Sequence, residues 1–433
     1  MFLALRGERT DGHLHIKDAL AGGAVAICAE DGDSSLNHAM QTEVLTVRDT
    51  HEALSLLTTA YRKELSSRFV AITGSNGKTT TKDILGRILS CRGDCVWSKA
   101  SYNNHVGVPL TILEAMDSTR HVVCEAGSNH PGELAPLLEM ISPEIGILTS
   151  LGQEHLEHFG DMDGVVKEES QIALAVRPSG LLIVNGDSPR VDEITQKAQT
   201  RVVTVGFDSK NDVVVYNTSV MVEGTSFHLR SESGLIQPGK YQISHSGSHH
   251  AVNASLAMVA AGYLDYSEDE IRKALLACKP SRMRSEWMSF NGTQILNDAY
   301  NANPESMRAA LATIAEIESK GRKIAVLGGM AELGAKSHEA HLALGRELKS
   351  HGIEFLISVG ESGKLIAEGA RSAGGEVKCR TVGDVPSASV ALAELIQPGD
   401  TILIKASRSV GLEQAIHSME LRGKHQTTFE GGG

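Results

Sequence analysis

The stretch "AITGSNGKTTTKDIL", residues 71–85, places two glycines, a lysine and three consecutive threonines between an apolar run and a helical segment. Residues 69–72 predict a short buried strand, and residues 80–89 have helical spacing, with their isoleucines and leucines on one side. A strand, a glycine turn and a helix in this order are typical of a phosphate-binding loop, here in a shortened form over residues 74–79. The sequence therefore predicts that Lys78 holds a nucleoside triphosphate. The alternative interpretation is an ordinary glycine turn with a solvent-exposed lysine.

Several residues of this loop predict specific contacts with a nucleotide. Gly74 and Gly77 would let backbone N–H groups turn towards an anion at the helix N-terminus, where the helix dipole favours negative charge. Lys78 would reach the β- and γ-phosphates, and the Thr79 hydroxyl would bind Mg²⁺. We therefore expect ATP and Mg²⁺ as cofactors. In this part of the chain the predicted ATP-binding residues are Gly74, Ser75, Asn76, Gly77, Lys78, Thr79 and Thr80.

The composition excludes several classes of protein. A chain of 433 residues is longer than one typical core, so two or three domains are expected. A net charge of −12 without a run of lysine and arginine argues against a general nucleic-acid binder. The six cysteines are scattered and complete no zinc site, so we expect reduced thiols. No apolar stretch is long enough to span a membrane. We expect a cytoplasmic monomer without membrane insertion.

The alternation of strand and helix patterns predicts an α/β protein of three domains. Residues 1–67 form a small α/β unit with short apolar strands. In residues 68–284, strands and helices alternate repeatedly, which indicates a doubly wound, mostly parallel sheet that carries the phosphate loop. Residues 202–243 change to short alternating segments, so an antiparallel insertion is expected there. Residues 285–433 predict a third, Rossmann-like α/β domain.

Polar residues follow two predicted strands of the central sheet. Glu125 ends an apolar strand, at the edge where a doubly wound sheet presents its ligands, so its carboxylate could bind Mg²⁺ beside Thr79. His155 follows another strand end, in a loop rich in carboxylates. The alternatives are a surface glutamate at a turn and an exposed loop histidine. The segment "KEES", which contains Glu169, reads on propensity alone as a solvated helix face.

The segment "NDAYNANPESM", residues 297–307, places polar side chains between an apolar strand and a helix. Such side chains are costly to bury without partners, so a binding surface is the economical interpretation. The alternative is a capped turn, with Asn303 as the N-cap and Pro304 at the first helical position. Both interpretations can hold together.

Taken together, these segments resemble the Mur ligase family, and the resemblance runs from residue 2 to residue 408. The matching segments are "FLALRGERTDGH", "ITGSNGKTTTKD", "NNHVGVPLTIL", "EAGSNHPGEL", "SLGQEHLEHFG", "NDAYNANPESM", "GGMAELG" and "ILIKASR".

The resemblance implies an ATP-dependent amide ligase of peptidoglycan precursor synthesis. It implies that UDP-N-acetylmuramoyl-tripeptide is activated as an acyl phosphate and then joined to D-alanyl-D-alanine. The implied catalytic residues are Lys78, His155, Glu169 and Lys405. The implied metal ligands are Thr79, Glu125, His155 and Glu169. The implied additions to the ATP site are Arg282, Asn297, Asp298, Tyr300, Asn301 and Asn303, and the implied substrate-binding residues are Asn104, Asn129 and His130.

Three departures from the family pattern bear on these roles. Most Mur ligases have a carbamylated lysine where this chain has Glu169, and glutamate supplies a comparable carboxylate without CO₂. Lys167, two residues away, is expected on another helix face. The first domain resembles the family's sugar-nucleotide-binding domain without its first strand. Gly329 stands where the family commonly has aspartate.

Other functions remain open from the sequence. The chain could act on the substrate of another Mur ligase or of folylpolyglutamate synthetase. A relative that binds ATP but has no ligase activity is the alternative from a different class.

Overall fold

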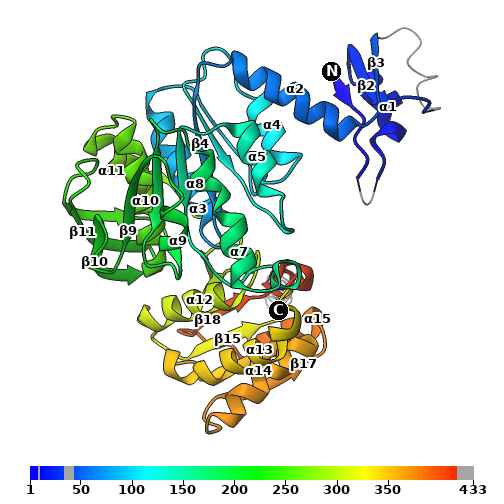
Figure 1. Cartoon of the computed structure of the whole chain (residues 1–433). Helices are drawn as coiled ribbons and strands as arrows, with labels where there is room; N and C mark the ends of the chain where they lie inside the picture. The colour runs from blue at the N-terminus through cyan, green and yellow to red at the C-terminus, as the bar shows by residue number, and fades with distance from the viewer. Residues whose placement is uncertain (8–9, 34–42, 417–433) are drawn as a thin grey trace, which may run out of the picture.

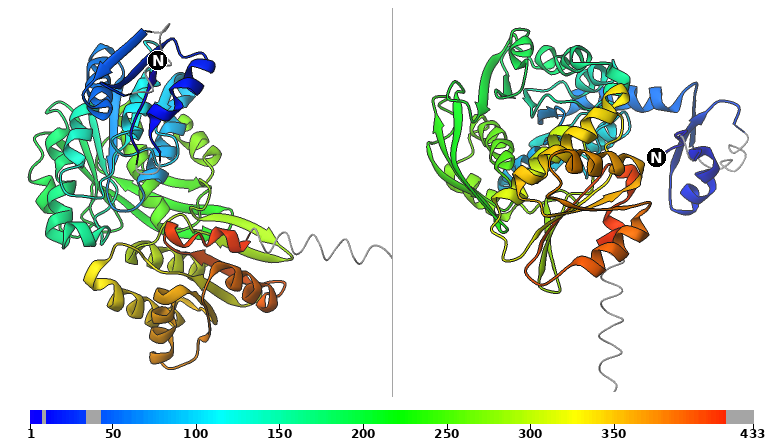
Figure 2. Two further views of the ribbon diagram at one scale, coloured as in Figure 1. Left: turned by 90° about the vertical axis from the view of Figure 1, so that its right-hand side faces the viewer. Right: turned by 90° about the horizontal axis from the view of Figure 1, so that it is seen from below.

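Three separate β-sheets organise the chain in the computed structural model, which describes residues 1–7, 10–33 and 43–416 (Figure 1). The first sheet is parallel, in the order β1-β2-β3. Its small core is formed by Ala4, Ile16, Ile27 and Ala29. Figure 1 and the right-hand view of Figure 2 show this unit at one side of the molecule, joined to the rest through α2. The elements of this unit are β1 (Phe2–Leu3), η1 (Gly12–His15), α1 (Ile16–Ala21), β2 (Ala26–Glu30), β3 (Glu43–Val47) and α2 (Thr50–Glu64).

The second sheet has nine strands in the order β12-β11-β10-β9-β8-β7-β4-β6-β5. The pairs from β5 to β10 are parallel, whereas β10, β11 and β12 pair antiparallel. The predicted antiparallel segment is therefore confirmed from β10 onwards, but it extends the edge of the main sheet. The strands are β4 (Arg68–Thr73), β5 (Cys95–Trp97), β6 (His121–Glu125), β7 (Ile145–Leu148), β8 (Leu181–Asn185), β9 (Arg201–Gly206), β10 (Val213–Met221), β11 (Gly224–Ser231) and β12 (Gly239–Ile243).

Helices cover both faces of this sheet, as the doubly wound pattern predicts. Side chains alternate along β4, so Val70 and Ile72 join the core under α3, α10 and α11, while Phe69 and Ala71 join the core on the other face. The helices are α3 (Lys78–Leu89), η3 (Ser90–Arg92), α4 (Gly107–Leu113), α5 (Leu134–Ile141), α6 (Leu156–Phe159), α7 (Met162–Glu169), α8 (Gln171–Ala175), α9 (Val191–Thr195), α10 (Ser248–Tyr263) and α11 (Glu268–Ala277).

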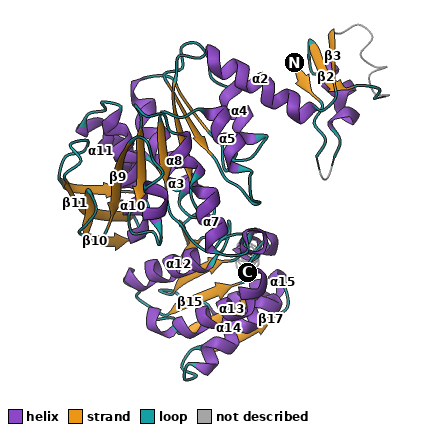
Figure 3. Cartoon of the chain, viewed as in Figure 1, coloured by secondary structure: helices purple, strands orange, loops and turns teal. Residues whose placement is uncertain are grey.

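The third sheet has six strands in the order β13-β14-β18-β15-β16-β17, and all pairs except β13-β14 are parallel. Figure 3 shows its strands lying between helices. The elements are β13 (Glu286–Phe290), β14 (Thr293–Asn297), α12 (Pro304–Glu316), β15 (Lys323–Leu327), η4 (Gly334–Lys336), α13 (Ser337–Glu347), η5 (Lys349–His351), β16 (Phe355–Val359), α14 (Gly360–Ser372), β17 (Lys378–Val382), α15 (Val385–Leu395), β18 (Thr401–Lys405) and η6 (Arg408–Val410).

The predicted α/β class with parallel-dominated sheets is confirmed. All six cysteines are free thiols. Over the described parts of the chain, no helix combines the length and the apolar character needed to cross a bilayer.

Candidate active site

A cavity of about 530 Å³ lies between the central sheet and the third domain. Its central wall is formed by the phosphate loop and by residues that follow β6 and β7, at the carboxyl ends of parallel strands. Its opposite wall is formed by residues 298–306, at the start of α12, and by Lys405 at the end of β18. Figure 1 shows α12 and β18 beneath the central domain. Ligands of doubly wound sheets bind at this edge.

The phosphate loop adopts the conformation that its glycines predict. Gly74 and Gly77 have φ values of 120° and 90°, in the region that disfavours L side chains. A Cβ at Gly77 would lie 2.5 Å from Asn253 Oδ1, so a larger residue would also collide with α10. α3 begins at Lys78, directly after this turn. The first N–H groups of a helix have no partner within it, and the first residues of α3 line the cavity.

Lys78 is held inside the loop and close to a carboxylate. Its Nζ donates to the Gly74 carbonyl and lies 3.6 Å from Glu154 Oε1. Burial raises the pKa of Glu154 to about 8, although Lys78 acts in the opposite direction. The lysine is therefore positioned at the helix N-terminus, where an anion would bind.

Glu125 has an oxygen that no described residue satisfies. The side chain is 1% exposed, and its Oε1 accepts a hydrogen bond from Asn103 Nδ2 at 3.0 Å. Its Oε2 is buried without a hydrogen-bond partner among the described residues. A buried, unpaired carboxylate oxygen is costly unless a cation binds it. Glu125 and Thr79 both line the cavity, so this donor set fits Mg²⁺.

Glu169 is buried behind the phosphate loop. Its Oε2 accepts from Thr73 Oγ1 at 2.8 Å, and the Gly74 N–H also donates to this carboxylate. Burial raises the pKa of Glu169 to about 7, whereas the charge of Lys78 lowers it. Lys167 is exposed on another face of α7, as its spacing predicts. Within residues 167–169, the carboxylate that bonds to the loop is therefore that of Glu169.

His155 lines the cavity and contacts the third domain. Its Nδ1 forms a hydrogen bond with Glu332 Oε2, and the Glu157 N–H donates to the Glu332 carbonyl at 3.1 Å. Burial lowers the pKa of His155, and Glu332 opposes this effect. Glu332 belongs to the "MAELG" segment and was not among the predicted site residues.

The polar segment of the third domain faces the phosphate loop. Asn303 is the N-cap of α12, since its Oδ1 accepts from the Ser306 N–H at 2.8 Å, and Pro304 is the first helical residue. The capped turn is thus confirmed. The same side chain donates from Nδ2 to Asn76 Oδ1 at 2.9 Å, across the cavity. One asparagine therefore caps the start of a helix and joins two domains.

Asp298 and Lys405 form an ion pair within the third domain. Lys405 Nζ donates to Asp298 Oδ2 at 2.6 Å and to the Asn301 carbonyl at 2.9 Å. Asp298 Oδ1 also accepts from the Ser285 N–H at 2.9 Å. Both residues line the cavity, and in this structure Lys405 holds the 298–301 segment in place.

The structure brings together most of the predicted site residues, and places six outside the cavity lining. The predicted residues that line it are Ser75, Asn76, Gly77, Lys78, Thr79, Thr80, Glu125, Asn129, His155, Asp298, Tyr300, Asn301, Asn303 and Lys405. Two predicted residues, Gly74 and Glu169, lie behind the loop and outside the lining. The other predicted residues outside the lining are Asn104, His130, Arg282 and Asn297.

Near neighbours take the positions of two of these residues. Asn104 Oδ1 accepts from the Gly107 N–H at the start of α4, while the adjacent Asn103 faces the cavity. Arg282 is exposed, whereas Arg284 lines the cavity with its guanidinium carbon 3.8 Å from the Tyr300 ring centroid.

Other lining residues were missed from the sequence. They include Ser101, Asn103, Glu154, Asn185, Phe207, His249, His250, Asn253, Arg284 and Glu305. The polar residues 248–250 and 253 in the first turns of the otherwise apolar α10 were the available signal for His249, His250 and Asn253. The other residues have no distinctive local pattern.

Comparison with known proteins identifies the family. Residues 72–261 match the Mur ligase middle domain, residues 283–408 match the Mur ligase glutamate ligase domain, and residues 1–62 match the Mur ligase family catalytic domain.

Individual relatives match over nearly the whole chain. The UDP-N-acetylmuramoyl-tripeptide–D-alanyl-D-alanine ligase of Bacillus subtilis is 32% identical, covering 97% of this chain and 90% of that one. The Escherichia coli ligase of the same name is also 32% identical, covering 98% and 91% of the two chains. The crystal structure of MurF from Acinetobacter baumannii superposes with a TM-score of 0.86 at 28% identity, covering 96% of this chain and 90% of the other. The predicted resemblance is therefore confirmed, and this chain belongs to the Mur ligase family.

Proposed function

We propose that this protein joins D-alanyl-D-alanine to UDP-N-acetylmuramoyl-tripeptide at the expense of ATP, in peptidoglycan precursor synthesis. Relatives that carry this name match 97–98% of the chain. The observation that carries the proposal is the cavity in which a phosphate loop of one domain faces a polar segment of another, with Asn76 bonded to Asn303. This arrangement suits a nucleotide that bridges two domains.

The reaction begins with ATP at the N-terminus of α3. Backbone N–H groups of the loop and the Lys78 ammonium bind the phosphates and offset their negative charge. The substrate carboxylate then attacks the γ-phosphate, which gives an acyl phosphate and ADP. The amine of the dipeptide attacks the acyl carbon, and the tetrahedral intermediate collapses to an amide with loss of phosphate. Positioning and electrostatic stabilisation are the main contributions of a protein to such phosphoryl transfer.

Four residues would hold Mg²⁺: Thr79, Glu125, His155 and Glu169. The unpaired Glu125 Oε2 is the observation that supports this assignment. When bound, Mg²⁺ neutralises charge on the transferring phosphoryl group. His155 is oriented by its bond to Glu332, which ties this part of the site to the third domain.

The third domain would supply the adenosine site. Tyr300, Asn301 and Asn303 line the cavity, and Asp298 lies at the same wall. Asn297 supports this segment from the end of β14. The peptide substrate would approach from the side of Asn129, with His130 next to it in the chain and Asn104 at the start of α4. Arg282 would reach the phosphates only after a rearrangement, because it is exposed here.

The proposal also covers the domain limits, the cellular compartment and the oligomeric state of the enzyme. We place its domain limits at residues 67/68 and 284/285, which separate the three sheets. Because the reaction consumes ATP, we assign it to the cytoplasm, and we propose that the protein acts as a monomer.

Phosphate release from ATP tests this function directly. We expect release in the presence of UDP-N-acetylmuramoyl-tripeptide and D-alanyl-D-alanine together, with the amide product identified by mass. Release with a folate and glutamate, or with the amino acid of another Mur ligase instead of the dipeptide, would reassign the substrate. ATP binding without any ligation product would contradict the proposal.

A further inference from the structure

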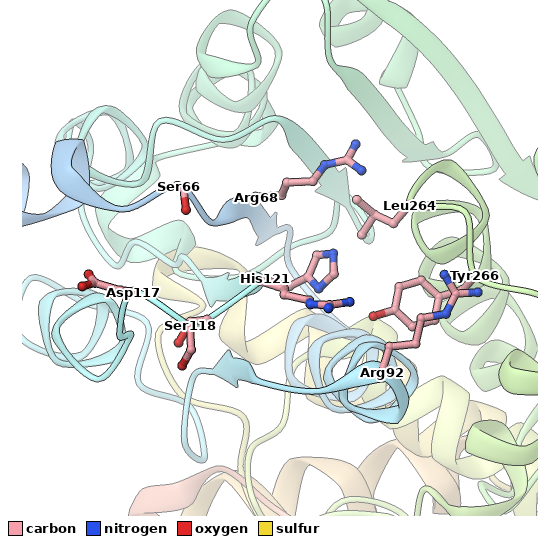
Figure 4. A pocket seen from close by; sticks show the side chains of 10 residues that line it. Ser66, Arg68, Arg92, Asp117, Ser118, His121, Leu264 and Tyr266 are labelled. Atoms are coloured by element: carbon pink, nitrogen blue, oxygen red, sulfur yellow. The ribbon is translucent and has the colours of Figure 1, made fainter.

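A second cavity, of about 400 Å³, lies at the opposite edge of the central sheet (Figure 4). Its wall includes the first residues of β4 and β6, Arg68 and His121, so it lies where these parallel strands begin. None of its lining residues lines the active-site cavity. The proposed ligase chemistry therefore uses no residue of this second cavity.

Three of the ten residues that line this cavity are arginines. It contains Arg68, Arg92 and Arg120, and Asp117 is the only acidic residue in it. Arg68 is bonded to Glu144 at 2.6 Å and Arg92 to Glu270 at 2.5 Å, so these two charges are partly offset. Within the part of the chain that the structure describes, no acidic side chain pairs with Arg120. At least one full positive charge is thus available to a ligand.

His121 offers ring nitrogens that are open to the cavity. The residue is 8% exposed, and none of the described residues forms a hydrogen bond with its ring. Figure 4 shows the ring between Arg68 and Tyr266, and the centroids of the His121 and Tyr266 rings are 5.8 Å apart. The ring lines the cavity without a partner among the described residues, so a ligand there can bond to it.

The charges around His121 favour an anion. Burial, together with the charges of Arg68, Arg120 and Arg92, lowers the pKa of His121 to about 4, while Glu144 opposes this shift. The ring is therefore neutral at pH 7 and retains one N–H donor.

Arg92 is already held in position for a ligand. Its guanidinium carbon lies 4.4 Å from the Tyr266 ring centroid, and its Nε and Nη2 donate to Glu270 at 2.6 and 2.5 Å, which leaves Nη1 for a ligand. A guanidinium that is fixed before binding loses less conformational entropy when it binds. Figure 4 shows Arg92 alongside Tyr266 at the edge of the cavity.

We propose that this cavity binds a small phosphate-bearing anion through Arg92, Arg120 and His121. Guanidinium groups match the geometry of phosphate oxygens, and a neutral imidazole adds an N–H donor. The volume lies within the range of small-molecule sites. Ser66 also lines the cavity, in the segment that joins α2 to β4, so a bound anion would lie beside the connection to the N-terminal domain.

Equilibrium dialysis with radiolabelled inorganic phosphate tests the proposal. The full-length Lys78→Ala variant serves as the background, because this change weakens phosphate binding at the active site. We expect saturable binding to this protein. Arg120→Gln should weaken it by about tenfold or more, since it removes one charge-assisted hydrogen bond. Arg120 has no described ion-pair partner, so the variant should fold normally.

Two further variants make the result decisive. Arg346→Gln changes the net charge equally but lies in the third domain, paired with Glu339, so it should leave phosphate binding within twofold. His121→Phe keeps a ring but removes the N–H donor, and should also weaken binding. Uridine monophosphate as a second probe distinguishes a nucleotide site from a phosphate site. Tighter binding than that of inorganic phosphate indicates a nucleotide site, and equal binding indicates a phosphate site. No saturable binding in the Lys78→Ala background, or unchanged binding in both Arg120→Gln and His121→Phe, would overturn the proposal.

Discussion

Replacing Glu169 should separate the stability of the fold from the activity of the enzyme. The side chain is 4% exposed and accepts hydrogen bonds from the Thr73 hydroxyl and the Gly74 N–H, directly beneath the phosphate loop. It therefore has a structural role as well as the proposed metal-binding role. Glu169→Ala removes both roles, whereas Glu169→Gln keeps an acceptor oxygen and removes only the charge.

The size of each effect follows from these contacts. Glu169→Ala leaves two buried donors without an acceptor, at a cost of about 1–3 kcal/mol each, so we expect a loss of about 2–6 kcal/mol in the free energy of unfolding. Glu169→Gln should cost less than about 2 kcal/mol. Both should lower the rate of phosphate release by at least about tenfold, because Mg²⁺ prefers an anionic oxygen.

Glu168 provides a matched control on the same helix. It is also buried, and its carboxylate accepts from the Gly132 and Leu134 N–H groups at 2.8 Å, at the start of α5. Glu168→Gln should therefore change stability to a similar extent while leaving turnover near that of the wild type. Lys167→Ala should change neither quantity, since Lys167 is exposed.

The assay combines urea denaturation with phosphate release under saturating substrates. Acetate or formate should partly restore the activity of Glu169→Ala, because a small carboxylate fits the space that the mutation opens. Wild-type activity should not depend on dissolved CO₂. Full turnover by Glu169→Gln would refute the metal-binding role. Loss of activity in Lys167→Ala with retention in Glu169→Ala would instead make Lys167 the candidate for carbamylation.

Three further predictions concern the phosphate loop, domain motion and the third domain. Lys78→Ala should abolish ligation and leave the circular dichroism spectrum and urea midpoint unchanged, and near-normal turnover would contradict the phosphate-loop assignment. Because the cavity walls belong to two domains, a non-hydrolysable ATP analogue with substrate should reduce the radius of gyration in X-ray scattering, and an unchanged profile would argue against closure. Asp400→Asn should destabilise the protein by about 2–3 kcal/mol at pH 7, because Asp400 is 2% exposed and bonded to Arg322 at 2.5 Å. Burial raises the pKa of Asp400, but hydrogen bonds from Arg322 and Gln397 lower it overall, so this stabilisation is present above about pH 4 and disappears as the pH falls. Equal urea midpoints for wild type and Asp400→Asn at pH 7 would refute this.

Features set by local sequence were predicted correctly. The strand, turn and helix around Gly74 and Gly77 depend on glycine conformations and helical spacing within a few residues. The N-cap at Asn303 depends on the asparagine and the proline that follows it. Such signals are complete within one short segment, so a single sequence is enough to read them.

Contacts between distant segments could not be predicted in this way. His155 meets Glu332 across 177 positions, and Asn76 meets Asn303 across 227. Each pair depends on how two separately folded domains dock. The same limit explains Asn103, because the backbone of its loop decides which of two adjacent asparagines faces the cavity and which accepts from the Gly107 N–H at the start of α4.

Single hydrogen bonds join the two cavity walls, and their small energy affects how the site opens. Asn76 bonds to Asn303, and Tyr300 bonds to Ser101 on the central side. A hydrogen bond of this kind contributes about 1 kcal/mol net, since water replaces it when the domains part. Separation of the domains also breaks the bonds of Glu332 with His155 and with the Glu157 N–H, which water can replace in the same way. ATP that contacts both walls stabilises only the closed state, in which the two domains lie close together. Its binding therefore shifts the population towards that state. Because Asn303 caps α12 through its own side chain, its position at the cavity does not depend on the partner domain.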